Sequence, residues 1–181
     1  MEFDLNKFSF FVCDFDGVLT DNHVYLNENG EEFVKCSRSD GYGIDILKSA
    51  NEIKLSSLNI AILSLERNSV VKARAKKLNV PSFTGVKNKY VFLEKTYFPS
   101  FGIDADEGFS RLIYLGNDLN DLKVIQKAQI SFVPIDSHSL LLKKATFVLD
   151  CKGGDGFVRQ VIENILGVEK VLTILDHLES Q

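Results

Sequence analysis

Short apolar runs alternate with segments of helical period along most of the chain. Buried strands are predicted at residues 8–14, 58–65, 111–115 and 130–135, with shorter ones at 82–84 and 146–149. Helices are predicted at residues 41–53, 68–78, 88–97, 117–127, 137–144, 155–165 and 168–179. Strands and helices that alternate in this way favour a mostly parallel sheet with helices on both faces. The expected fold is therefore an α/β, Rossmann-like three-layer sandwich.

A polar turn at Glu28-Asn29-Gly30 interrupts this alternation after the first strand. Residues 23–27 and 32–36 flank the turn and are predicted to pair as a β-hairpin, which we call the flap (about residues 22–37). A chain of 181 residues without repeats or linkers suits one domain, residues 1–181, with a helical tail at about 167–181.

Composition narrows the class of protein. The net charge of −4, with 45% hydrophobic and 25% charged residues, is typical of a soluble globular protein and argues against a nucleic-acid partner. No apolar run reaches the ~20 residues of a membrane span, and the acidic N-terminal stretch lacks the basic region of a secretory signal. Cys13, Cys36 and Cys151 form no paired motif, which indicates a reducing, cytoplasmic location.

Two acids stand where the first strand ends. Asp14 and Asp16 are two residues apart, so their carboxylates point the same way from an extended backbone, and Gly17 then allows a sharp turn. Carboxylate oxygens at a strand end suit Mg²⁺, which prefers few protein carboxylates together with water and phosphate. Asp14 could also act as a nucleophile and Asp16 as a proton donor. The alternative is that both acids only cap or turn the chain.

Weaker candidates stand at other strand ends. Ser64 follows the second long strand and could donate to a phosphate oxygen or cap a helix. Lys89 begins a predicted helix and could neutralise a phosphate or lie at the solvated surface. Asn117, Asp118 and Asp121 crowd a strand-to-helix turn, where simple N-capping is the alternative.

The order of these motifs along the chain is more specific than any one of them. The sequence Asp14-Phe15-Asp16-Gly17-Val18-Leu19-Thr20-Asp21, then a hydroxyl, a lysine and an acidic turn, resembles the haloacid dehalogenase superfamily over about residues 8–166. Segments 30–35, 39–44 and 153–159 are similar to its cap-less sugar-acid phosphatases. That branch includes 3-deoxy-manno-octulosonate 8-phosphate phosphatase, the nonulosonate 9-phosphate phosphatases and the phosphatase-like domain of some sialate cytidylyltransferases.

The resemblance implies a Mg²⁺-dependent phosphoric monoester hydrolase that works through an aspartyl-phosphate. Asp14 would be the nucleophile, and Asp16 would protonate the leaving sugar and later activate water. Lys89 and Ser64 would hold the phosphoryl group. The substrate would be a phosphorylated 2-keto-3-deoxy sugar acid.

The resemblance also implies a metal site with one departure from the family. The implied ligands are Asp14, Asp16 and residue 117. Asp118 and Asp121 would lie next to these ligands and support them without contacting the metal. Residue 117 is Asn where the family expects Asp, and sialate cytidylyltransferase domains are similar in this respect. An amide oxygen can bind Mg²⁺ but carries no formal charge, so weaker metal binding is expected.

Several positions are similar to the nonulosonate side of the branch. Glu66 and Lys77 match residues of the nonulosonate phosphatases, and Asp155 stands where octulosonate enzymes tend to carry a basic residue. An acylneuraminate-type 9-phosphate is therefore favoured over octulosonate 8-phosphate. Leu65 departs from the family, because it replaces a glycine that is common in the second motif, and the backbone there is expected to approach phosphate less closely. The residues expected to contact the substrate are Asp16, Asp40, Gly41, Glu66 and Lys77.

In this branch the flap implies a homotetramer, in which the hairpin of one subunit helps to close the active site of the next. The flap of this chain carries Val24, Tyr25, Leu26, Phe33 and Val34, more apolar surface than an isolated hairpin should expose. A second hypothesis, favoured by Asn117, is a weakly active or inactive tetramerisation domain that accompanies a sialate cytidylyltransferase.

Overall fold

Strand β1 lies inside a parallel sheet, between two strands that come much later in the sequence. The computed structural model describes residues 3–180, and the sheet has the strand order β5-β4-β1-β6-β7-β8. All neighbouring pairs in it run parallel. The strands are β1 (Phe10–Cys13), β4 (Asn59–Leu63), β5 (Ser82–Phe83), β6 (Leu112–Leu115), β7 (Ile130–Pro134) and β8 (Phe147–Leu149).

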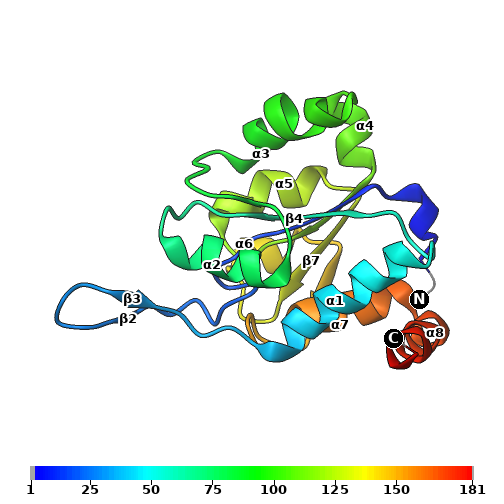
Figure 1. Ribbon diagram of the computed structural model, residues 1–181. Coiled ribbons are helices and arrows are strands. Elements are labelled where there is room, and N and C mark those ends of the chain that lie inside the picture. The colour runs from blue at the N-terminus through cyan, green and yellow to red at the C-terminus, as the bar shows by residue number, and fades with distance from the viewer. Residues whose placement is uncertain (1–2, 181) are drawn as a thin grey trace.

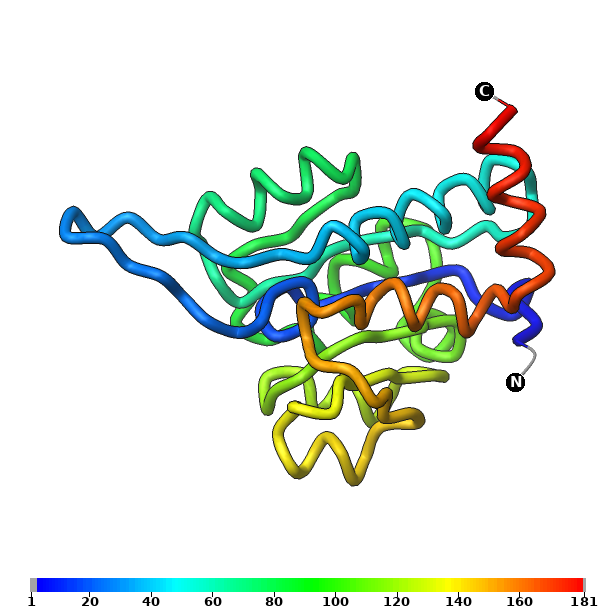
Figure 2. The backbone as a smooth tube through the Cα atoms, turned by 90° about the horizontal axis from the view of Figure 1, so that it is seen from below, coloured from blue at the N-terminus to red at the C-terminus, as the bar shows by residue number. Residues whose placement is uncertain are grey.

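Four helices cover one face of the sheet (Figures 1 and 2). Phe11 and Cys13 of β1 point toward this layer, where they join a core that includes Ile44 and Ile162. Helices α1 and α7 approach closely at Gly43, where an added Cβ would lie 2.7 Å from Cα of Arg159. The four helices are α1 (Arg38–Glu52), α2 (Ser69–Leu78), α7 (Phe157–Leu166) and α8 (Val168–Glu179).

The opposite face is covered by shorter helical segments. Phe10 and Val12 of β1 point toward this second core, together with Tyr114 and Phe98. The alternation of strand side chains between two cores confirms the predicted three-layer α/β sandwich. The segments are α3 (Lys89–Phe92), the π-helix η2 (Leu93–Tyr97), the 3₁₀ helix η3 (Phe98–Phe101), α4 (Ala105–Ser110), α5 (Leu122–Lys127) and α6 (Ser139–Leu142).

The structure changes several predicted boundaries. Helix α1 begins at Arg38 because the Ser37 hydroxyl accepts the Ser39 amide, so Asp40 lies within the helix. Pro99 was expected in a loop but lies in the first turn of η3, where its missing N–H is not needed. Helix α4 was not predicted, although Asp104 caps it by accepting the Glu107 amide at 2.9 Å.

The predicted helical tail forms α8, and residue 181 lies outside the described residues. Helix α8 packs on α1 and α7 beside the N-terminal end of the described chain, far from the flap (Figures 1 and 2). Within residues 3–180, no helix combines the length and apolar character needed to cross a membrane.

The flap is an antiparallel hairpin that projects from the body of the molecule (Figure 1). Strands β2 (Tyr25–Leu26) and β3 (Glu32–Phe33) pair Tyr25 with Phe33 and Leu26 with Glu32. More than half of the surface of Val24, Tyr25, Leu26 and Phe33 is exposed in the isolated chain. Exposed apolar side chains gathered on a two-stranded hairpin are typical of a contact surface.

Candidate active site

A pocket of about 320 Å³ lies where strands β1, β4 and β6 end. The carboxyl ends of parallel strands meet at this edge, which is where open α/β sheets place their ligands. The lining combines four segments: the loop after β1, the flap, the loop after β4 and the turn after β6. Its residues include Asp14, Asp16, Val24, Glu32, Leu65, Glu66, Asn117 and Asp118.

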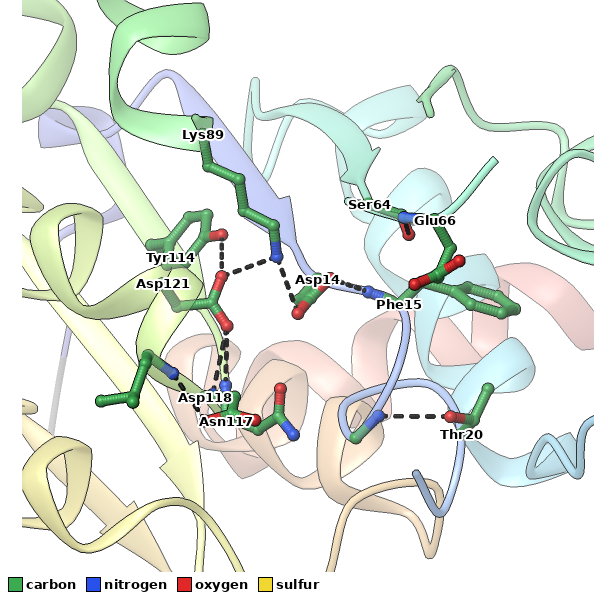
Figure 3. Close-up of polar contacts among 12 residues, drawn as sticks. Asp14, Phe15, Thr20, Ser64, Glu66, Lys89, Tyr114, Asn117, Asp118 and Asp121 are labelled. Carbon is green, nitrogen blue, oxygen red and sulfur yellow. Dashed lines mark hydrogen bonds and ion pairs between the residues drawn. The ribbon is translucent and has the colours of Figure 1, made fainter. Parts of the chain in front are cut away.

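The ammonium of Lys89 lies between the carboxylates of Asp14 and Asp121 (Figure 3). The ammonium is almost fully buried and bridges Asp14 Oδ2 at 2.7 Å and Asp121 Oδ1 at 2.8 Å. Burial alone would lower the pKa of Lys89, but the carboxylates of Asp14 and Asp121 outweigh that effect and raise it. The alternative of a solvated surface lysine is therefore excluded.

Asp121 fixes the turn after β6. Its Oδ1 accepts from Lys89 Nζ at 2.8 Å and from the Tyr114 hydroxyl at 2.6 Å. Its Oδ2 accepts the backbone amides of Asn117 at 3.0 Å and Asp118 at 3.3 Å. A carboxylate has about four acceptor positions, so those of Asp121 are filled by the protein itself. Asp121 thus holds both Lys89 and the turn.

Asp14 and Asp16 have different surroundings. Asp14 is buried, and its Oδ1 accepts the Phe15 amide at 2.7 Å. Burial and the nearby charge of Asp121 raise the pKa of Asp14 well above its ordinary value. Asp16 is only partly buried, and burial followed by the Glu66 carboxylate raises its pKa. The raised pKa of Asp16 suits the role of a proton donor, because the carboxyl group must carry a proton before it can give the proton away.

The loop after β1 requires glycine beside Asp16. Gly17 has φ +75°, and an added Cβ would lie 1.8 Å from the side-chain nitrogen of Asn117. Its amide donates to the Thr20 hydroxyl at 3.2 Å (Figure 3). Gly154 stabilises the same loop, because its amide donates to the Val18 carbonyl at 3.0 Å. Asn117 can therefore lie directly against the loop that carries the two acids.

The pocket carries oxygen donors that fit a metal ion. Among residues 3–180, no group of three or more His, Cys, Asp or Glu side chains is arranged to hold a metal. The pocket does offer two carboxylates, Asp14 and Asp16, and the amide oxygen of Asn117. Two carboxylates supplemented by water and phosphate are what Mg²⁺ commonly uses in proteins. These three residues therefore fit Mg²⁺ without a dedicated all-protein cage.

The remaining predicted site residues lie around the pocket or outside it. Ser64 is buried next to the pocket residues Leu65 and Glu66 but is not part of the lining, and its Oγ accepts the Glu66 amide at 3.0 Å. Asp40 is fully buried in α1 and its Oδ1 accepts the Arg159 amide at 3.1 Å, at the start of α7. Gly41 and the exposed Lys77 border a second hollow, together with Arg38 and Arg74. Asp40, Gly41 and Lys77 do not line the pocket of their own chain.

Sequence reasoning missed two contributors to the site. Tyr114 reaches Asp121, and the signal was a tyrosine within the otherwise aliphatic run Leu112–Leu115 that leads into the acidic turn. Glu32 of the flap accepts a hydrogen bond from the Asn68 side chain at 3.0 Å, which joins the flap to the start of α2. The sequence offers no local signal for that contact, because the two residues are 36 positions apart.

The chain is similar in sequence to known phosphatases. No protein-family model matches the chain. The 3-deoxy-D-manno-octulosonate 8-phosphate phosphatase KdsC of Yersinia pestis is 32% identical over 156 residues, which are 86% of this chain and 78% of that protein. KdsC of Escherichia coli K12 is 32% identical over 160 residues, covering 86% and 77% of the two chains.

Solved structures give the same family. A HAD-family hydrolase from Streptomyces avermitilis is 34% identical with a TM-score of 0.80, over 92% of this chain and 89% of that chain. The octulosonate phosphatase of Moraxella catarrhalis, solved with magnesium, phosphate and KDO, is 25% identical with a TM-score of 0.81, over 96% and 93%. Together with the site, these similarities show that the chain belongs to the haloacid dehalogenase superfamily, in the family of KdsC-type phosphatases.

Proposed function

We propose that the chain is a Mg²⁺-dependent phosphatase that hydrolyses a phosphorylated 2-keto-3-deoxy sugar acid through Asp14. The observation that carries the proposal is the buried ammonium of Lys89, held against Asp14 in a pocket that also contains Asp16. A carboxylate nucleophile beside a buried positive charge is suited to phosphoryl transfer, where charge neutralisation and positioning supply most of the rate. The names of the relatives support the same reaction class.

The first step forms a bond between an Asp14 carboxylate oxygen and phosphorus, while the bond from phosphorus to the sugar oxygen breaks. Asp16 donates a proton to that leaving oxygen, for which its raised pKa is suited. Lys89 balances the charge that collects near Asp14, and Ser64 donates its hydroxyl hydrogen to a phosphoryl oxygen. Mg²⁺, held by Asp14, by the Asp16 oxygen that does not carry the proton, and by Asn117, would neutralise charge on the phosphoryl oxygens.

The second step releases inorganic phosphate. Asp16, now ionised, takes a proton from a water molecule as the water oxygen attacks phosphorus. The bond between phosphorus and Asp14 breaks, which restores the free carboxylate. The proton that Asp16 gave to the sugar is thereby replaced, so each turnover consumes one water molecule.

The proposed substrate is a nonulosonate 9-phosphate of the acylneuraminate type, with octulosonate 8-phosphate next. Glu66, the residue by which the sequence resembles the nonulosonate phosphatases, lines the pocket. The relatives, however, are named for octulosonate 8-phosphate, so both sugars belong in the test. We expect Mg²⁺-dependent phosphate release from a panel of sugar-acid phosphates, with the highest kcat/KM for a nine-carbon acid. Equal rates on unrelated phosphate esters would contradict a sugar-acid specificity.

Lys77 enters this proposal through the tetramer. It is exposed on α2 beside Arg38 and Arg74, outside the pocket of its own chain. The pocket mouth itself carries the acids Glu32 and Glu66, which repel a substrate carboxylate. A basic surface from a neighbouring subunit would supply the missing positive charge.

The cytoplasm is the proposed location of the protein. Cys13, Cys36 and Cys151 are all free in the structure, and they would stay reduced in that compartment.

The assembly can be tested directly. We expect a homotetramer in which the flap contacts a neighbouring subunit. Tyr25, Leu26 and Phe33 of the flap expose 53%, 66% and 56% of their surface in the isolated chain, which supports such a contact. Light scattering should give the mass of four chains at micromolar concentration. Replacing Leu26 and Phe33 by charged residues should dissociate the assembly and reduce turnover. Val168→Glu changes another exposed apolar position, on α8, and should leave the assembly and the turnover unchanged. A monomeric wild-type protein would contradict the shared active site.

The metal requirement gives another prediction, which concerns Asn117. One negative charge fewer at the proposed ligand position should leave the wild-type protein with an unusually high half-saturating Mg²⁺ concentration. Asn117→Asp should lower it, because the substitution adds a negative charge at the ligand position. A Mg²⁺ titration of phosphate release compares the two proteins, with Asn120→Asp at the pocket rim as the control. Identical half-saturation would mean that residue 117 does not contact the metal.

A tetramerisation domain with little or no activity is the second candidate, favoured by Asn117. In that case the tetramer forms, yet neither the wild-type protein nor Asn117→Asp releases phosphate from the panel. Co-purification with a sialate cytidylyltransferase encoded beside it would then support the structural role. Measurable Mg²⁺-dependent turnover by the wild-type tetramer would rule it out.

A further inference from the structure

The hydroxyl of Tyr114 takes no part in the two proposed steps of hydrolysis. Tyr114 lies in β6, is fully buried, and belongs to the apolar core formed with Phe98 and Phe109. Burying a hydroxyl in such a core costs free energy unless it forms a hydrogen bond, and phenylalanine would fill the same space. The hydroxyl donates to Asp121 Oδ1 at 2.6 Å. Its presence is therefore explained by Asp121 and not by packing.

Tyr114 shares its acceptor with Lys89. Figure 3 shows Tyr114, Asp121, Lys89 and Asp14 as one continuous chain of contacts. Lys89 Nζ lies 2.8 Å from Asp121 Oδ1 and 2.7 Å from Asp14 Oδ2. An ammonium between two carboxylates lies where their attractions balance. How strongly Asp121 attracts Lys89 depends on how much of its charge other donors already satisfy.

The other oxygen of Asp121 cannot compensate if Tyr114 is lost. Asp121 Oδ2 is held by the backbone amides of Asn117 and Asp118, and these belong to a turn whose cap is formed by Asp118. Without the hydroxyl, Oδ1 would keep Lys89 as its donor and attract it more strongly. Burial, and then the carboxylates of Asp121 and Asp14, raise the pKa of Tyr114 well above its ordinary value, so its hydroxyl remains a donor.

We propose that Tyr114 is a positioning residue: by sharing Asp121 Oδ1 with Lys89, it keeps the ammonium against the nucleophile Asp14. The inference about the rate rests on the proposed phosphatase function. Tyr114 touches neither the pocket nor the substrate, so its loss should act on kcat and spare KM. The expected decrease in kcat is about tenfold, the lower end of the effect of removing a group directly behind a metal ligand, because Tyr114 acts on Lys89 only through Asp121.

The test compares two buried tyrosines in the same apolar core. Tyr114→Phe removes the hydroxyl that contacts Asp121, and Tyr97→Phe is the matched control from η2. Steady-state kinetics with the best sugar-acid phosphate gives kcat and KM, and thermal melting verifies that both variants fold. Nitrogen NMR of protein labelled with ¹⁵N-lysine, without substrate, reports the environment of the Lys89 ammonium; Lys89→Arg assigns its resonance.

We expect Tyr114→Phe to lower kcat, leave KM within about threefold and shift the Lys89 resonance, while Tyr97→Phe changes none of these. Wild-type kcat in Tyr114→Phe would overturn the proposal. A lower kcat with an unmoved Lys89 resonance would overturn it as well, because Tyr114 would then act by another route. If the wild-type protein hydrolyses nothing on the panel, the proposed function fails separately. The resonance then decides on Tyr114, with a shift supporting the contact role and no shift refuting it.

Discussion

Asp14→Asn should reduce kcat more than about 1,000-fold, because an amide cannot form the acyl-phosphate that the proposed mechanism requires. The fold should persist, since Lys89 keeps Asp121 as its counter-ion at 2.8 Å. Phosphate release under saturating substrate and Mg²⁺ measures the loss. Mass spectrometry of rapidly quenched protein should find a phosphoryl group on the wild-type chain and none on the variant.

The exposed Asp106 provides the control for this substitution. Asp106→Asn removes a carboxylate far from the chemistry and should keep wild-type kcat and phosphorylation. If Asp14→Asn retained more than about a tenth of wild-type kcat, the covalent mechanism would be wrong, whatever the state of the fold. Asp16 would then be examined as a base that activates water directly.

Lys89→Met should cost both activity and stability. It leaves Asp14 and Asp121 buried beside each other without the ammonium that bridges them at 2.7 and 2.8 Å. Removing one partner of a buried ion pair typically costs about 3–5 kcal/mol in the free energy of unfolding. For a chain of this size, each kcal/mol corresponds to about 2–4 °C in Tm. Metal-free thermal melting should therefore show a Tm lower by about 6–20 °C, and kcat should fall more than about 100-fold.

Two further variants separate charge from packing at this position. Lys87→Met changes an exposed lysine of the same segment and should alter the free energy of unfolding by less than about 0.5 kcal/mol. Combining Lys89→Met with Asp14→Asn removes one of the two uncompensated carboxylates and should recover part of the lost Tm. If the double variant melts no higher than Lys89→Met alone, repulsion between Asp14 and Asp121 is not the source of the instability.

The architecture could be predicted because the periodic signals were strong and local. Phe10–Cys13 and Asn59–Leu63 are nearly continuous apolar runs, and the polar Glu28-Asn29-Gly30 turn marks the flap. Helix α4 escaped detection because its six residues, Ala105–Ser110, are too short to show a period. Its cap at Asp104 was the available signal.

Some residues of the site could be predicted from local sequence signals, whereas others depend on contacts between distant parts of the chain. Asp14, Asp16 and the turn from Asn117 follow directly after strands, so the fold class alone brings them to one edge. The partners of Lys89 could not be read from spacing, because Asp14 and Asp121 lie 75 and 32 residues away in the chain. Tyr114, in contrast, lies only seven residues before Asp121, and a tyrosine in an otherwise aliphatic strand was a local signal that was missed. The assigned roles of Asp40, Gly41 and Lys77 stay predictions.

The position of β1 in the sheet has a consequence for synthesis on the ribosome. Phe11 pairs in register with Ile60 on one side and Ile113 on the other, so the nascent β1 has no sheet partner when it emerges. At about 5–20 residues per second, β4 follows after several seconds and β6 after several more. The loop that carries Asp14 and Asp16 gains the Gly154 contact later still. An apolar strand exposed for that long is a target for chaperones, and a translation pause before β6 has emerged should promote aggregation more than a pause after it has emerged.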